Sequence, residues 1–163
     1  VGPDAGAGDG APPGMGHLTP EVQALRLMVH RPEEIIGHLS PLLFEGGLNR
    51  SAYLLLSGSV DLHAARADAG SDVADLLGRL AVQDASDDDA LGVLTRLAHL
   101  AAQRAAVALE TEARLSGDLA AYQPAISFLR TEVIRFREVV ADGAEVEALL
   151  RWLSDYSEGR VDG

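Results

Sequence analysis

Apolar residues recur along most of this chain at the three- and four-residue spacing that is typical of amphipathic α-helices. The first such stripe follows Thr19, a favourable N-cap, and Pro20, which suits the first position of a helix. The pattern predicts a helix over residues 19–30. The residues expected to face the core in this helix are Val22, Leu25 and Val29.

Four further helical segments are predicted before residue 84. Pro32 begins a short helix that Pro41 ends, because proline has no N–H for a helix interior. Asn49 is the expected N-cap of the next helix, and residues 60–70 form a weaker one. A clean amphipathic helix follows, with Ser71 or Asp72 as its N-cap. Its expected inward residues are Val73, Leu76, Leu77 and Leu80.

The longest predicted helix follows three consecutive aspartates. Ser86 or Asp87 is the expected N-cap, and the apolar period continues from about residue 88 to residue 115. Aspartates in a first helical turn interact favourably with the helix dipole, so these three need no metal to explain them. The expected buried face consists of Leu91, Leu94, Ala98, Ala101, Ala105, Ala108 and Leu109.

Two more helices are predicted after residue 117. Pro124 is expected to start the first, and the turn sequence at residues 142–145 is typical of two antiparallel helices. The second is predicted over residues 144–156, with Trp152 at the edge of its apolar face. The expected inward residues are Ile126, Leu129, Val133, Phe136 and Val140, followed by Val146, Leu149, Leu150, Leu153 and Tyr156.

The predicted fold class is all-α, a helical bundle joined by a long helix to a C-terminal helical hairpin, because no segment alternates convincingly as a strand. We expect a flexible Gly- and Pro-rich linker over residues 1–17. The bundle with its long connecting helix is expected over residues 18–115, and the C-terminal helices, including the hairpin, over residues 118–158. Because position 1 is Val, we expect a segment of a longer protein.

Composition narrows the possible partners. The formal net charge of −12 argues against a broad phosphate-binding surface, so we expect no direct nucleic-acid binding. The chain has no cysteine, which excludes disulfides and thiolate metal sites. No apolar run of about 18 residues and no secretory leader are present. We therefore expect a cytoplasmic protein without membrane association.

No catalytic constellation is evident. The five histidines form neither an H-E-x-x-H pair nor a Glu-x-x-His motif, and no serine lies in a G-x-S-x-G elbow. Glu110 and Glu112 are two apart in a helix and point to different sides. Arg130, Arg135 and Arg137 are interpreted as a solvated helix face. We expect no catalytic residue, no metal and no cofactor.

Excess apolar residues in the C-terminal helices favour a docking surface. Phe128, Ile134 and Val139 fall outside the main apolar stripe of their predicted helix, and Trp152 and Tyr156 lie on the next one. The alternative is that these residues pack against the long helix. The sequence leaves both interpretations open.

Four segments, in order, resemble the C-terminal region of bacterial DnaG-type DNA primases. The pattern A-L-x-L-x-x-x-x-P-E matches residues 24–33, and a loop with Phe44 and Tyr53 follows. The pattern L-L-x-R-L-A-V-E matches residues 76–83 except for its last position, which is Gln in this chain. The pattern L-x-x-x-R-x-x-x-x-L-x-x-E matches residues 100–112. The resemblance extends over roughly residues 18–138.

The resemblance implies a non-catalytic module of a primase. In that family the module contacts the N-terminal region of the DnaB-type replicative helicase, a hexamer, and recruits primase to the replication fork for primer synthesis. We expect this segment to be monomeric alone and to use its terminal hairpin for the contact. The expected contact residues are Phe128, Ile134, Arg137, Val139, Trp152 and Tyr156. The alternatives are the N-terminal domain of a replicative helicase and an unrelated helical adaptor.

Overall fold

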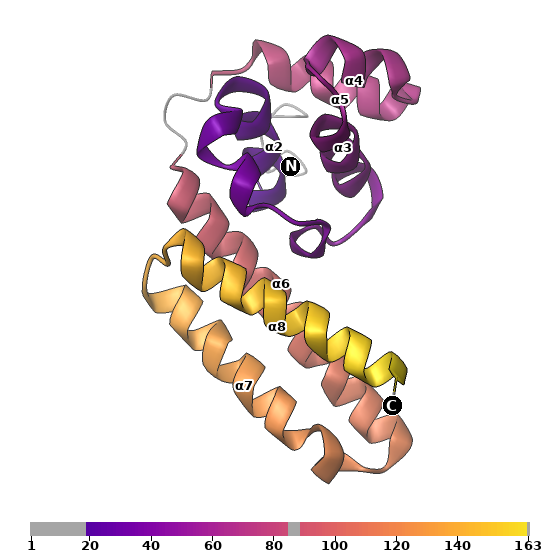
Figure 1. Ribbon diagram of the computed structural model, residues 1–163, viewed down its shortest axis with the longest axis vertical. Helices are drawn as coiled ribbons and strands as arrows, with labels where there is room; N and C mark the ends of the chain where they lie inside the picture. The colour runs from indigo at the N-terminus through magenta and orange to yellow at the C-terminus, as the bar shows by residue number, and fades with distance from the viewer. Residues whose placement is uncertain (1–18, 85–88, 163) are drawn as a thin grey trace, which may run out of the picture.

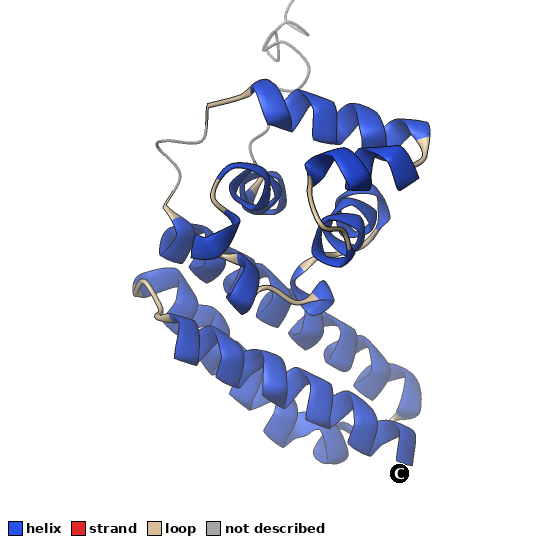
Figure 2. Ribbon diagram, turned by 45° about the horizontal axis from the view of Figure 1, so that its top comes forward, coloured by secondary structure: helices blue, strands red, loops and turns tan. Residues whose placement is uncertain are grey.

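A computed structural model describes residues 19–84 and 89–162, and within these ranges the chain consists of helices joined by loops, without a strand (Figure 1, Figure 2). The prediction of an all-α fold is therefore confirmed. The predicted linker over residues 1–17 lies outside the described residues. The two predicted caps Ser86 and Asp87 lie outside them as well.

The helices form a compact bundle from which one long helix extends (Figure 1). The bundle helices are α2 (Pro20–His30), α3 (Gly47–Gly58), α4 (Leu62–Asp68) and α5 (Ser71–Val82). Three 3-10 turns connect α2 to α3, namely η1 (Pro32–Glu34), η2 (Ile36–His38) and η3 (Pro41–Leu43). The remaining helices are α6 (Ala90–Ser116), α7 (Leu119–Glu138) and α8 (Gly143–Asp162).

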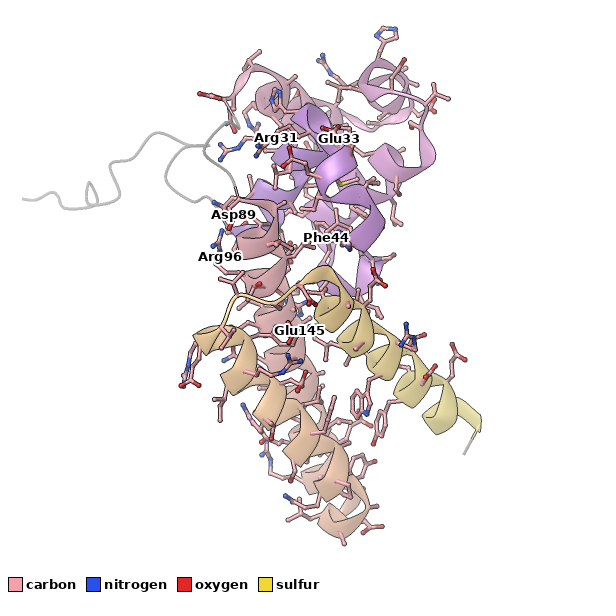
Figure 3. All side chains as sticks on the ribbon, turned by 60° about the vertical axis from the view of Figure 1, so that its left-hand side comes forward. Arg31, Glu33, Phe44, Asp89, Arg96 and Glu145 are labelled. Carbon is pink, nitrogen blue, oxygen red and sulfur yellow. The ribbon has the colours of Figure 1, made fainter. Side chains whose placement is uncertain are left out.

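Short polar residues cap the starts of α2, α4, α6 and α7, and the cap of α2 is the one that was predicted. The Thr19 hydroxyl accepts a hydrogen bond from the Val22 N–H at 3.2 Å, which confirms the predicted cap of α2. At the start of α6 the carboxylate of Asp89 accepts from the Gly92 N–H at 3.1 Å. Figure 3 shows Asp89 on the first turn of α6. The last of the three consecutive aspartates is therefore a helix cap.

The start of α3 differs from the prediction, because Asn49 is not its N-cap. The helix begins at Gly47, and Gly46 and Gly47 have φ angles of 139° and 64°, which disfavour residues with a Cβ. No side chain caps the helix. Glu21 of α2 accepts hydrogen bonds from the Glu45 N–H at 2.8 Å and from the Asn49 side-chain amide at 3.0 Å. Asn49 therefore joins the start of α3 to α2 instead of capping its own helix.

Two other predicted helix starts are wrong. The helix α5 begins at Ser71 with Gly70 as N-cap and no side-chain cap, so neither Ser71 nor Asp72 caps it. Pro124 lies inside α7, which begins after the Asp118 carboxylate accepts from the Ala121 N–H at 3.2 Å. A proline this early removes only one backbone hydrogen bond, and the Asp118 cap favours the earlier start.

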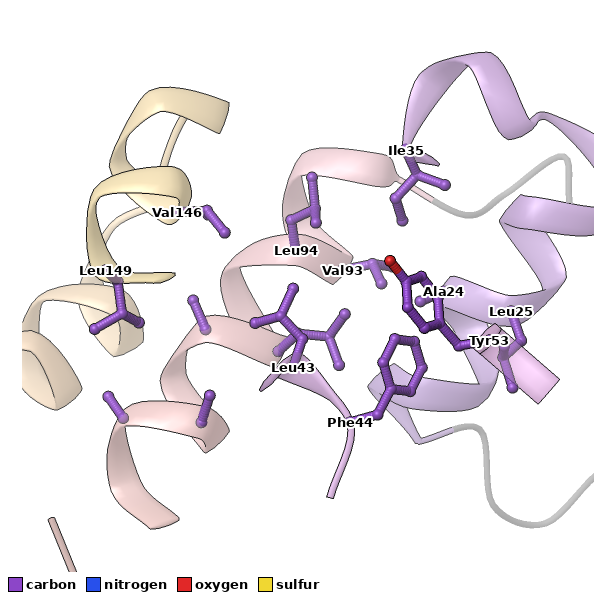
Figure 4. Packing of buried hydrophobic residues seen from close by; sticks show 14 of the residues in the cluster. Ala24, Leu25, Ile35, Leu43, Phe44, Tyr53, Val93, Leu94, Val146 and Leu149 are labelled. Atoms are coloured by element: carbon purple, nitrogen blue, oxygen red, sulfur yellow. The ribbon is translucent and has the colours of Figure 1, made fainter. Parts of the chain in front are cut away.

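The first half of α6 completes the core of the bundle. Val93, Leu94 and Leu97 are fully buried, and Figure 4 shows Val93 and Leu94 between bundle residues and α8. The predicted buried stripe is wrong at Leu91, which is 41% exposed, and at Ala108. The bundle, α7 and α8 contact α6 on different sides, so its buried face is wider than one stripe and is turned relative to it.

The second half of α6 packs closely against α7. Buried alanines of α6 allow this approach, and the His99 Nδ1–H donates to the carbonyl of Val133 at 3.0 Å. The Arg130 guanidinium binds Glu110 through two hydrogen bonds of 2.6 and 3.1 Å. The closest antiparallel pair of the C-terminal part is therefore α6 with α7.

Helix α8 packs along α6 and reaches the bundle (Figure 1). Val146 and Leu149 are 0% and 1% exposed, and His38 of η2 lies 3.3 Å from the Glu147 carboxylate. The C-terminal helices are therefore held against the rest of the molecule, and the final pair is not a free hairpin. The helix α8 (Gly143–Asp162) continues beyond the predicted end at residue 156.

One buried hydroxyl joins the beginning of α6 to the loop between α7 and α8. Thr95, which is 5% exposed, donates to the carbonyl of Leu91 at 2.7 Å and accepts from the Ala141 N–H at 2.9 Å. Ala141 is 1% exposed, so its N–H has little access to water. Thr95 therefore satisfies a buried backbone donor that the helices leave unpaired.

We expect Thr95→Val to destabilise the fold by about 1–3 kcal/mol, because it preserves shape but leaves the Ala141 N–H without its acceptor. Urea unfolding followed by circular dichroism measures this change. The matched control is Thr111→Val in the same helix, where the hydroxyl makes the equivalent 3.0 Å bond to Val107 but is exposed. The control should cost below about 0.5 kcal/mol. Equal losses in both variants would contradict the assigned role.

Candidate interaction surface

Three of the described histidines, His30, His38 and His99, join elements of the fold. His30 Nε2–H donates to the carbonyl of Leu80 at 2.8 Å, which ties α2 to α5. His38 contacts Glu147 of α8, so neither of the two combines with Glu33 or Glu34 into a ligand set. Within residues 19–84 and 89–162, no group of three or more His, Asp or Glu side chains is placed to hold a metal ion.

Three of the six predicted contact residues form an aromatic stack between α7 and α8. The ring centroids of Phe128 and Trp152 are 4.5 Å apart, and those of Trp152 and Tyr156 are 5.1 Å apart with planes 6° from parallel. All three are half-buried and pack against the core. Their apolar character therefore has a structural explanation, which is the attachment of α8 to α7.

The other three predicted contact residues are exposed at the end of α7. Ile134 and Val139 are 49% and 61% exposed, and Arg137 is exposed between them. Ile134 is six residues beyond Phe128 in the same helix, which turns it to a different face. The structure therefore divides the predicted surface into an aromatic stack and an exposed group.

Two residues that were predicted to be buried enlarge the exposed group. Val140 is 63% exposed, and Leu91 is 41% exposed at the start of α6, where Thr95 binds both the Leu91 carbonyl and the Ala141 N–H. We call the exposed apolar residues Leu91, Ile134, Val139 and Val140 the α7-end patch. The run of three apolar residues from Val139 was the signal that sequence reasoning missed, since such a run before a turn cannot face one core.

A charged cluster holds the turn beneath this patch. Arg135 donates to Glu132 of α7 at 2.6 Å and also binds Glu145 of α8, which Figure 3 places at the start of that helix. The hydrogen bond that Arg135 donates to Glu132 raises the pKa of Arg135 above its ordinary value, and the charges of Glu132 and Glu145 add to the effect. Asp142 and Glu145 cap each other's N–H groups at 2.9 and 3.0 Å.

The sequence indicated that the arginines of α7 form one solvated face, and this interpretation is wrong. Arg130 binds Glu110 and Arg135 binds Glu132 and Glu145, whereas Arg137 is exposed beside the α7-end patch. Two arginines fix the positions of α7 and α8, and Arg137 is available to a partner. A positive charge next to an apolar patch is typical of protein interaction surfaces.

Comparisons with known protein families, with curated proteins and with solved structures give no match to this chain. In the described part of the chain, no helix is both long and apolar enough to cross a membrane. The surface chemistry of α6, α7 and α8 is therefore the basis for a functional proposal.

Trp152 is the only tryptophan of the chain, so its fluorescence reports on the docking of α8. We expect Phe128→Ala to increase quenching of Trp152 by acrylamide, because the ring that covers one face of the indole is removed. The control is Val139→Ala, which changes an exposed residue of the same helix segment. Unchanged quenching in Phe128→Ala would show that the stack does not shield Trp152.

The ion pair between Glu110 and Arg130 predicts a pH dependence. The Arg130 hydrogen bond, with its charge and that of Arg114, lowers the pKa of Glu110 below 4.5, although partial burial opposes the shift. The stabilisation is therefore complete above pH 4.5 and is lost as the pH falls through the lowered pKa.

We expect Glu110→Gln to lower the thermal midpoint at neutral pH, because it removes the charge from this pair. The difference from the unchanged protein should shrink as the pH is lowered below 4.5. Thermal unfolding across this pH range measures both effects. Glu138→Gln, at an exposed position near the end of α7, serves as the control and should change the thermal midpoint less. A difference independent of pH would contradict the assignment.

Proposed function

We propose that this chain is the helicase-binding module of a bacterial DnaG-type primase. In this role it has no catalytic activity, acts in the cytoplasm and recruits primase to the replicative helicase for primer synthesis. The observation that carries the proposal is the position of the four segments that resemble the family. They occupy the contacting surfaces of the bundle and of α6.

The packing of the first three segments supports this proposal. Ala24 and Leu25 are fully buried in α2, and Phe44 stacks on Tyr53 with ring centroids 4.9 Å apart. Gln83, which stands where the family pattern has an acid, accepts a hydrogen bond from Arg26 at 3.3 Å. An amide therefore keeps the contact between α2 and the end of α5 that a carboxylate would make.

The fourth segment supports the proposal through the shape of the molecule. Residues 100–112 lie in α6 where it leaves the bundle, and they carry α7 and α8 away from it (Figure 1). A module that is tethered to one protein and docks on another needs a surface that its own helices leave exposed. The α7-end patch with Arg137 supplies exposed apolar area and a charge beside the start of α6.

We place the first contact to be tested on the exposed residues Ile134, Arg137 and Val139. Phe128, Trp152 and Tyr156 remain candidates through their uncovered edges, but their substitution also loosens α8. Removing α8 altogether would uncover the surface that Val146 and Leu149 bury. Point substitutions at exposed residues are therefore a cleaner test than truncation.

The test is a titration of the hexameric replicative helicase of the same organism with this domain. We expect Ile134→Asp combined with Val139→Asp to weaken binding by about tenfold or more, because a charge would be desolvated in an apolar contact. The control is Val82→Asp, at a valine that is 85% exposed at the end of α5. Circular dichroism checks that each variant is folded.

Two results would contradict the proposal at different levels. Equal binding by the patch variant and the control would move the contact away from the end of α7. Absence of binding by the unchanged domain at tens of micromolar, a weak affinity for such modules, would reject the helicase as partner.

A further inference from the structure

A groove of about 710 Å³ lies between the first turns of α2 and α3 and the middle of α6. Leu100, Arg104 and Val107 of α6 are spaced by four and three residues and therefore form one stripe along its wall. Val107 is 49% exposed although it lies in the middle of the longest helix. This stripe is thus a part of α6 that the other helices leave open.

The walls of the groove are held in place by hydrogen bonds. Glu21 of α2 binds the Glu45 N–H and the side chain of Asn49, which joins α2 to the start of α3. On the other side, the guanidinium of Arg104 donates to the carbonyl of Leu42 at 3.4 Å. The groove is therefore formed before anything binds, which lowers the entropic cost of binding.

The charge at the mouth of the groove favours a cationic partner. Two carboxylates, Glu21 and Glu45, stand on the same rim, and Glu45 is exposed. Arg104 is the single basic residue of the lining, and its guanidinium is directed to a backbone carbonyl. The whole chain carries a formal charge of −12, which adds a long-range attraction for cations.

The shape of the groove favours a helical partner. Helices and their caps form its sides, and the described residues present no strand edge to which an extended peptide could add. Leu100 and Val107, about two turns apart on α6, are complementary to the apolar face of a second helix that lies beside it. The volume is within the range of about 300–1,000 Å³ for ligand sites, enough for several side chains.

We propose that this groove binds a basic amphipathic helix of another protein. The apolar face of that helix packs on Leu100 and Val107, and its Arg or Lys side chains meet Glu45 and Glu21. The groove is formed by α2, α3 and α6, whereas the proposed helicase contact lies at the end of α7. Either proposal can therefore be rejected by experiment without rejecting the other.

The probe is a synthetic amphipathic helix with leucines on one face and arginines on the other, labelled for fluorescence anisotropy. Its control has glutamates in place of the arginines. We expect Val107→Asp and Glu45→Arg each to weaken binding of the basic peptide by about tenfold. Val107→Asp places a charge in the apolar contact with the peptide, and Glu45→Arg reverses a charge of the rim.

Two exposed positions outside the groove provide matched controls. Val82→Asp repeats the apolar-to-acid change on α5, and Asp75→Arg repeats the charge reversal on the same helix. Each should change binding by less than about twofold. If Asp75→Arg weakens binding as much as Glu45→Arg, the peptide follows net charge alone and the proposal is overturned.

Two other occupants of the groove would also overturn the proposal. Binding of the peptide only after removal of residues 1–17 would assign the groove to the chain's own N-terminal segment. A dimer in analytical ultracentrifugation that Val107→Asp dissociates would assign it to a second copy of the chain. Loss of peptide binding in both groove variants, with both controls unaffected, is the result that supports the proposal.

Discussion

The structure depends on one helix that belongs to two cores at once. The first half of α6 inserts Val93, Leu94 and Leu97 into the bundle, and its second half buries Leu109 and Ala113 against the C-terminal helices. A continuous helix transmits position and orientation between its ends because every backbone group is paired within it. The bundle and the C-terminal helices are therefore placed relative to each other by α6 rather than by a loop.

Polar side chains of α6 also hold α7 and the loop that follows it. Thr95 of α6 satisfies the buried N–H of Ala141, and Glu110 of α6 binds Arg130 of α7, so the middle of α7 and the loop after it are tied to the same helix. Once α7 is fixed, Arg135 and the aromatic stack position α8. Ile134, Val139 and Val140 stay exposed because α8 packs along α6 and does not cover them.

The two proposed surfaces have different physical origins. The α7-end patch exists because a run of apolar residues meets a turn and only Ala141 of that run is buried. The groove exists because α2 and α3 begin at some distance from α6 and leave part of one α6 face, around Val107, uncovered. Both surfaces border α6, yet they present different charges, Arg137 beside the patch and two carboxylates at the groove.

The sequence by itself determined the helical fold, the Thr19 cap and the inward residues of α5, because caps and apolar period act within one or two turns. Only the tertiary structure decided that Glu21 binds the start of α3, that Leu91 and Val140 are exposed, and that α8 contacts the bundle. The predicted contact residues show the same difference. The sequence identified Ile134 and Val139 as apolar residues outside the main stripe, but it did not show that Phe128 stacks on Trp152. Periodicity shows that a face is apolar, whereas the neighbour that covers it depends on packing between residues far apart in the chain.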